Sequence, residues 1–248
     1  MALTSSNPAF SDKTFDVRAA YGAGMTISGT VNKAGILMLC VFATAAFTWN
    51  KFYTTGDAAT IGGYTIIGAL GGFVAALVTI FKKEWSPVTA PIYALLEGLF
   101  LGALSATLEV RYPGIAIESV ALTFGTLFCL LLAYRSGLIR PTEKFQMGIV
   151  AATGGIALIY FGSMLLGLFH IQIPGIFGSG PIGIIFSLVV VCIAALNLVL
   201  DFGFIEQGAM RGAPKYMEWY GAFGLMVTLI WLYLEIIRLV SKLRSDRR

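Results

Sequence analysis

Charge is scarce in this chain. Only 12% of its 248 residues are Asp, Glu, Lys or Arg, while 57% are hydrophobic, and the mean hydropathy is +0.83. A soluble domain of this length needs a larger charged surface, so the composition excludes that class of protein. The lipid bilayer is the solvent that suits such a sequence, because a membrane span takes about 20 mostly apolar residues.

Histidine and cysteine are also rare. The single His170 and the three cysteines Cys40, Cys129 and Cys192 lie far apart, without the spacing of metal ligands. No glycine-rich phosphate loop with a lysine is present, and Asp201 is the only aspartate inside an apolar run, where an intramembrane aspartyl protease needs two. We therefore expect no enzyme activity, no cofactor and no tight metal site.

Seven apolar runs are long enough to cross a membrane. None alternates with a period of two, which favours helices over a barrel. We predict an all-α integral membrane protein with one seven-helix transmembrane domain over residues 34–240. The predicted spans are about 34–53, 61–81, 88–108, 116–134, 148–169, 181–204 and 217–237.

The two ends of the chain differ from this apolar body. Residues 1–33 contain Asn7–Pro8, several Ser, Thr and Gly residues, and charges of both signs. They read as a polar, flexible cytoplasmic leader without the apolar run of a signal peptide. Residues 241–248 read as a basic tail.

Lysines and arginines in the loops predict the orientation, because they gather on the cytoplasmic side. The opposite loops hold only Lys51 and Arg111, so we expect a cytoplasmic N-terminus and a bacterial inner (plasma) membrane. With this orientation the five cations from Arg238 to Arg248 would lie outside, contrary to the rule, and we give the loop cations more weight. Because these cations flank membrane spans, we expect no nucleic-acid partner. The cations on the N-terminal side are Lys13, Arg18, Lys33, Lys82, Lys83, Arg135, Arg140, Lys144, Arg211 and Lys215.

Two pairs of glycines have the spacing that lets helix backbones approach closely. Gly68 and Gly72 are four residues apart, as are Gly98 and Gly102. These glycines can serve either the packing of helices within one chain or a dimer interface, and we favour packing within one chain.

Three acids lie inside the apolar runs: Glu97, Asp201 and Glu235. Ionisable residues at such depth are rare and mark proton sites or ion pathways. At a rise of about 1.5 Å per residue, Asp201 lies about 10 Å inside the membrane and Glu97 about 9–15 Å, so the two can share a layer. Glu235 lies near the far interface.

Each acid also has a simpler interpretation. Glu235 can pair with Arg238 at helical spacing. Glu97 can be a protonated residue in a helix seam, and Asp201 can accept hydrogen bonds from Asn197, one turn earlier. Asp201 is the hardest to dismiss, because an isolated carboxylate in an apolar medium is very unfavourable. We interpret it as a protonatable latch or ion ligand.

Three segments resemble the Bax inhibitor family, also known as YccA-like or transmembrane Bax inhibitor motif proteins. They are "APIYALLEGLFLGALS" in the third run, "ALNLVLDFGFIEQG" in the sixth and "LYLEIIRLV" in the seventh. The resemblance implies six helices around a central seventh helix and a pH-sensitive calcium leak.

The same resemblance implies roles for particular residues. Asp201 matches an aspartate of the sixth helix that senses pH together with an acid of the seventh. Lys82 or Lys83 lies where a basic residue of the family locks that aspartate. Glu235 matches the local sequence pattern around the acid of the seventh helix. The depth of Asp201 in the membrane, however, places the partner acid nearer Thr228. If that is the position, the second acid is missing there and Glu97 substitutes for it.

Three functions stay open at this point. The first is a pH-gated cation leak, with calcium as the cation, closed by shared protons or a lysine bridge in a layer containing Asp201. The second is a non-conducting regulator that docks through its leader, for example on a membrane-anchored AAA protease. The third is a proton-coupled transporter, which the lack of an evident inverted repeat disfavours.

Overall fold

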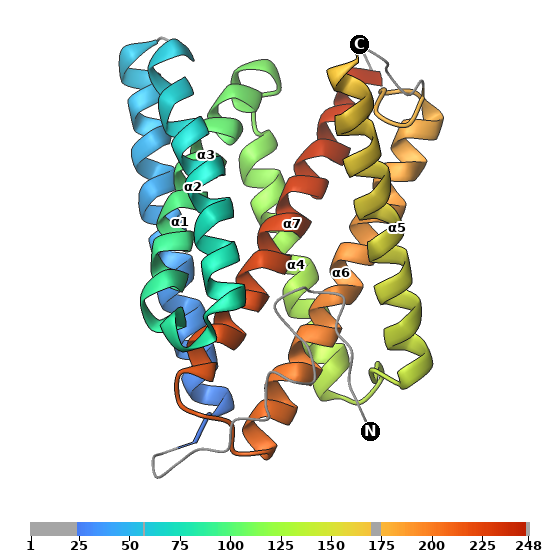
Figure 1. Cartoon of the computed structure of the whole chain (residues 1–248). Helices are drawn as coiled ribbons and strands as arrows, with labels where there is room; N and C mark the ends of the chain where they lie inside the picture. Colours follow the sequence, from blue (N-terminus) through green and yellow to red (C-terminus); the bar gives the residue numbers. More distant parts are fainter. Residues whose placement is uncertain (1–23, 57, 170–174, 247–248) are drawn as a thin grey trace. The chain divides into compact units, whose positions relative to one another are not determined.

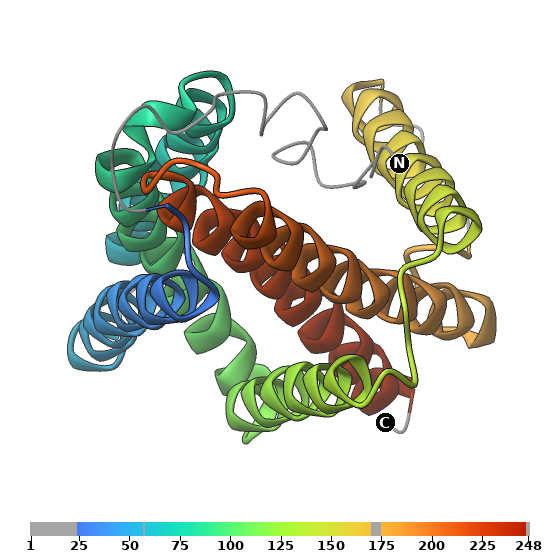
Figure 2. The same ribbon diagram turned by 90° about the horizontal axis from the view of Figure 1, so that it is seen from below.

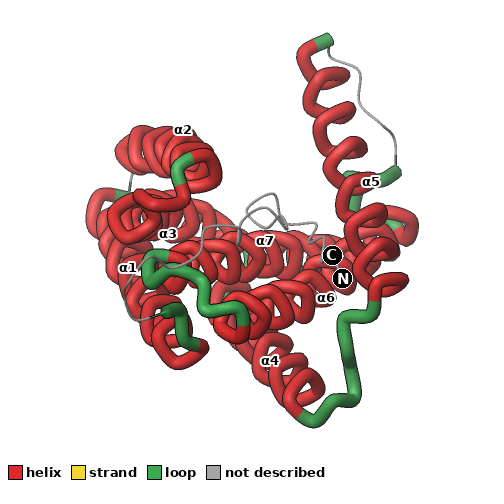
Figure 3. The backbone as a smooth tube through the Cα atoms, turned by 60° about the horizontal axis from the view of Figure 1, so that its bottom comes forward, coloured by secondary structure: helices red, strands yellow, loops and turns green. Residues whose placement is uncertain are grey.

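The computed structural model describes residues 24–56, 58–169 and 175–246. The leader residues 1–23, His170 and the last two arginines of the tail lie outside the described residues. In this part of the chain the backbone is helical with short connections (Figure 3). It divides into two compact units. One contains the described residues within Ile117–Phe202 and Thr228–Arg248, and the other those within Pro8–Ala116 and Gly203–Val227.

Seven α-helices within the described ranges are long and apolar enough to cross a membrane, as predicted (Figure 1). A short 3-10 helix, η2 (Lys83–Trp85), precedes the third. The first helix begins earlier than the predicted span, and the last runs further into the predicted tail. The α-helices are α1 (Ile27–Thr55), α2 (Ala58–Phe81), α3 (Ser86–Arg111), α4 (Ile115–Arg135), α5 (Glu143–Leu168), α6 (Pro181–Met210) and α7 (Met217–Asp246).

Polar side chains define where several helices begin. The Thr26 hydroxyl accepts a hydrogen bond from the Gly29 N–H at 3.0 Å and caps α1, which explains why this helix begins inside the predicted leader. Thr142 caps α5 in the same way. At the start of α4, the Glu109 carboxylate accepts the backbone N–H groups of Gly114 and Ala116. Unpaired N–H groups at a helix start need such acceptors.

In the unit that contains Pro8–Ala116, α3 packs against both α1 and α2 (Figure 1). The predicted glycine pairs make this possible. A Cβ atom at Gly98 would overlap Thr44 and the Val41 carbonyl of α1, and one at Gly102 would overlap the Ala45 carbonyl. Gly68 of α2 lies as closely against the backbone of α3. The glycines therefore serve intramolecular helix packing, the favoured interpretation.

We expect Gly102→Ala to lower the free energy of unfolding by about 1–3 kcal/mol, because the added methyl group forces α1 and α3 apart. Gly154→Ala in α5 is the matched control, since a Cβ atom there meets no atom within 4 Å. Denaturant-induced unfolding in detergent micelles measures both. Equal stability of the two variants would contradict the close packing.

Helix α7 is the most buried of the seven. In its most apolar window 67% of the residues are buried, against at most 50% in any other helix. It contacts α1 and α3 in one unit, through Glu218 and Phe223, and α4, α5 and α6 in the other, through its C-terminal half. Figure 2 shows α6 and α7 lying side by side in the latter unit. Each half of α7 is therefore packed against other helices of its own unit.

Candidate functional site

Asp201 lies within α6, about 14 Å along the helix from Met210. Its exposed fraction is 0%, and the four apolar residues 198–200 and 202 around it on the helix are also buried. The predicted burial of this acid is confirmed. Removing a carboxylate from water costs free energy that uptake of a proton relieves.

Asn197 lies one turn before Asp201 and is 2% exposed. Its side-chain amide donates to the Thr153 hydroxyl of α5 at 2.9 Å and to the Ile193 carbonyl of its own helix at 2.8 Å. It thus joins α5 to α6 one turn from the acid. Its support of Asp201 itself stays a prediction.

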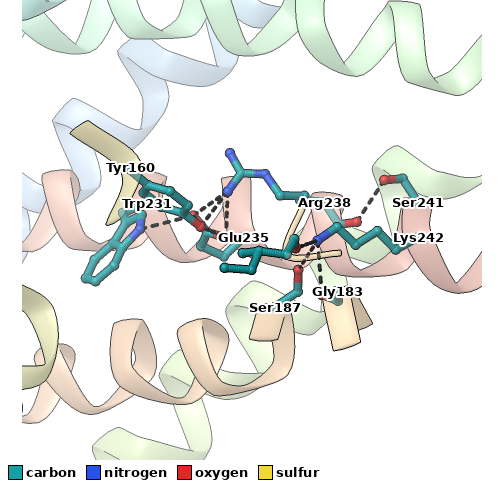
Figure 4. A network of polar contacts seen from close by, with 9 residues as sticks. Tyr160, Gly183, Ser187, Trp231, Glu235, Arg238, Ser241 and Lys242 are labelled. Carbon is teal, nitrogen blue, oxygen red and sulfur yellow. Dashed lines mark hydrogen bonds and ion pairs between the residues drawn. The ribbon is translucent and has the colours of Figure 1, made fainter. Parts of the chain in front are cut away.

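Glu235 occupies a polar cluster in the C-terminal half of α7 (Figure 4). It is 1% exposed, and its two carboxylate oxygens lie 2.9 and 3.0 Å from one guanidinium nitrogen of Arg238. The pairing of Glu235 with Arg238 at helical spacing, one of the two interpretations left open, is confirmed. The Trp231 indole N–H donates to the same carboxylate at 3.3 Å.

Tyr160 brings α5 into this cluster. Its hydroxyl lies 3.0 Å from both Glu235 oxygens and donates to the carboxylate, while Arg238 donates to that hydroxyl at 2.7 Å. The guanidinium also lies over the Tyr160 ring, 5.2 Å from its centroid. The Tyr160 hydroxyl therefore hydrogen-bonds both Glu235 and Arg238, which also pair with each other.

We expect Tyr160→Phe to lower the free energy of unfolding by about 1–2 kcal/mol, because it leaves the buried carboxylate and the guanidinium each short of one hydrogen bond. Tyr53→Phe is the matched control, since Tyr53 is 50% exposed on α1. Thermal unfolding followed by circular dichroism compares the two. A loss in the Tyr53 variant as large as that in the Tyr160 variant would show that the network contributes nothing specific.

A second ionic cluster lies at the other end of α7, in the unit containing α1 and α3. Glu218 is 0% exposed, and its carboxylate accepts hydrogen bonds from the Lys33 and Lys215 ammonium groups and from the N–H and hydroxyl of Thr26. Gly29 lies so close that a Cβ atom there would overlap the carboxylate. The cluster attaches the first turn of α1 to the first turn of α7.

The link before α7 also makes a polar contact with the start of α3. The Tyr216 carbonyl accepts the Ser86 hydroxyl at 3.0 Å. Burial, and then the nearby Glu84 carboxylate, raises the pKa of the Tyr216 phenol. The beginnings of α1, α3 and α7 are thus joined by polar contacts.

The other predicted site residues also belong to this unit. Glu97 is half-buried in α3, with its carboxylate against Gly72 of α2. Lys82 is exposed, and the Lys83 ammonium lies 5.7 Å from the centroid of the Tyr220 ring. Asp201 lies in the other unit, so a carboxylate layer with Glu97 and a lysine lock on Asp201 stay predictions.

The sequence did not identify three residues of these clusters. Glu218 looked like an ordinary acid in a first helical turn, and Tyr160 like one aromatic residue among many. Lys242 was assigned to the basic tail, yet it is 6% exposed within α7. For Lys242 the missed signal was the spacing of Trp231, Glu235, Arg238 and Lys242, which places polar groups every three to four residues on one face of α7.

The sixth and seventh helices thus contain the acids that the resemblance singled out. The family model described as Bax inhibitor 1 like matches residues 7–245. The chain belongs to the Bax inhibitor 1-like family. No match was found among curated proteins or among solved structures.

The family match covers all seven helices of this Bax inhibitor 1-like protein. The membership therefore concerns the whole transmembrane part of the chain. In the described residues, no three His, Cys, Asp or Glu side chains come together in a way that could hold a metal ion.

Proposed function

We propose that this Bax inhibitor 1-like protein is a pH-sensitive cation leak, with calcium as the cation that the family resemblance implies. The observation that carries the proposal is the complete burial of Asp201 among the apolar residues of α6. An acid at that depth is costly and is typical of ion or proton pathways.

The two fully buried glutamates, Glu218 and Glu235, lie beside cations, and the proposal gives them a structural role. Glu218 lies among two lysines and Glu235 beside Arg238. Cations at such distances stabilise an ionised carboxylate. Glu218 and Glu235 are therefore structural ion pairs in this proposal, and Asp201 is proposed as the switch on the ground of its burial.

The proposal includes an orientation. We place the N-terminus and the α6–α7 link in the cytoplasm of a bacterial cell, because the loop lysines and arginines gather on that side. The cation then crosses between the cytoplasm and the outside.

Flux into liposomes tests the proposal. The full chain is reconstituted in vesicles loaded with a calcium indicator, and calcium influx is recorded at about pH 6 and about pH 8, because burial shifts the pKa of an acid by an amount that depends on its surroundings. We expect influx above that of protein-free vesicles, with different rates at the two pH values. Influx equal to that of protein-free vesicles would contradict the leak and favour a non-conducting regulator.

A further inference from the structure

The Lys242 ammonium is buried in a set of neutral oxygen atoms. It donates to the Ile176 carbonyl at 3.1 Å, the Gly183 carbonyl at 3.0 Å and the Ser187 hydroxyl at 2.9 Å. Figure 4 shows the side chain reaching from α7 toward Ser187 and Gly183. An ammonium has three N–H donors and no acceptor, so each donor has one oxygen.

Among the side chains that the structure describes, no carboxylate lies within ion-pair distance of this ammonium; Arg238 and Glu235 of the same helix act on it only at longer range. The ion pairs described in this unit are those of Arg238 with Glu235 and Arg244 with Glu118, and the hydrogen bonds of the Lys242 ammonium go to the three neutral oxygens. Burying a charge is costly unless it is paired or coordinated. The oxygens therefore replace the hydration shell of the ammonium, much as carbonyl oxygens replace that of an ion in a channel filter.

The conformation of the backbone just before α6 places two of these oxygens near the ammonium. Gly175 has a positive φ of 87°, the left-handed conformation that favours glycine. Gly183 lies directly against the Gly178 carbonyl, where a Cβ atom would overlap it. The segment 175–180 therefore folds tightly over the first turn of α6 and brings the Ile176 and Gly183 carbonyls to the same ammonium.

We propose that the Ile176, Gly183 and Ser187 oxygens form a weak monovalent-cation site, and that Lys242 fills it as a tethered ammonium. The site lies at the N-terminal end of α6, whose dipole disfavours positive charge. A free ion therefore binds it weakly, as a conducting path requires. When the tethered ammonium is removed, a free ammonium ion of the same shape takes its place.

The test replaces Lys242 with alanine and returns the deleted atoms as a free ion. The n-propylammonium ion has the three carbons and the nitrogen that Lys242→Ala removes. We expect it to raise the Tm of the purified variant by about 3 °C at a concentration of about ten times its Kd. Tetramethylammonium has the same charge but no N–H donor, and we expect no rise from it.

Three controls isolate the site. The wild-type protein, whose site is filled, should not respond to n-propylammonium, and neither should Lys144→Ala, which removes an exposed lysine of α5. Adding Ser187→Ala to Lys242→Ala removes one of the three oxygens and should abolish most of the rise. Should both ammonium ions raise the Tm equally, or neither raise it, the cation site is wrong and Lys242 is only a structural anchor.

If Lys242→Ala does not fold in plain buffer, folding itself becomes the measurement. The variant is purified with n-propylammonium or with tetramethylammonium, and the monomer peak in size-exclusion chromatography is compared. A larger peak with n-propylammonium supports the site, and equal peaks overturn it.

A flux measurement tests what the filled site does and rests on the proposed leak. If the tethered ammonium blocks the cation path, Lys242→Ala should increase calcium influx and n-propylammonium should reduce it again. A selective Tm rise without any change in influx would keep the site and reject its role in the leak. Influx that rises without a selective Tm response would leave the leak intact and reject the site.

Discussion

Asp201→Asn should abolish the pH dependence of cation flux. Asparagine has nearly the shape of a protonated aspartic acid and does not ionise. The variant is therefore fixed in the uncharged state that the wild-type protein reaches at low pH. We expect its calcium influx to equal the low-pH influx of the wild-type protein at every pH, so that the ratio of rates between about pH 6 and about pH 8 falls to about one.

The control for this variant is Glu143→Gln, which neutralises an exposed acid in the first turn of α5. It should keep the wild-type pH profile, because an exposed carboxylate titrates in water and touches no buried network. An Asp201→Asn protein that still shows the wild-type profile would exclude Asp201 as the switch. A loss of pH dependence in both variants would point to net charge and not to the buried position.

The seven spans could be predicted because they depend on a single quantity, the length of uninterrupted apolar sequence needed to cross a bilayer. Their ends were less predictable, because they depend on individual polar contacts. The cap formed by Thr26 begins α1 inside the predicted leader. The last helix runs to Asp246, inside the predicted basic tail, and Lys242 of that tail is buried against other parts of the protein.

The candidate site was predictable only in part, for a related reason. Burial of Asp201 follows from its apolar neighbours along the chain, which the sequence displays. The partners of Glu218 lie in α1 and in the α6–α7 link, and Tyr160 reaches Glu235 from α5. Such contacts depend on which helices are neighbours, and span length and hydropathy carry no information about that.

Tyr220 and Tyr233 illustrate the same limit. Tyrosines near the two ends of a membrane span commonly lie at the membrane interfaces. In the structure Tyr220 and Tyr233 are 0% and 8% exposed. A tyrosine near the end of a span packs inside the protein when neighbouring residues of its unit cover it.

Glu218→Gln should cause the largest loss of stability among single substitutions in α7. The carboxylate accepts from Lys33 and Lys215 and twice from Thr26, whereas an amide offers one acceptor oxygen and adds two donors. At least one lysine then faces an N–H group in a buried site. We expect the free energy of unfolding to fall by on the order of 3 kcal/mol, measured by denaturant-induced unfolding in micelles, with the exposed Glu84→Gln as the control.

A double-mutant cycle then distinguishes the ion pair from simple loss of packing. Lys33→Met removes the lysine that lies closest to the Glu218 carboxylate and keeps most of its apolar stem. If the loss in Glu218→Gln comes from an ammonium left without its acceptor, adding Lys33→Met should cost less than the sum of the two single losses. Strictly additive losses would mean that Glu218 and Lys33 do not interact energetically, and that another contact attaches α1 to α7.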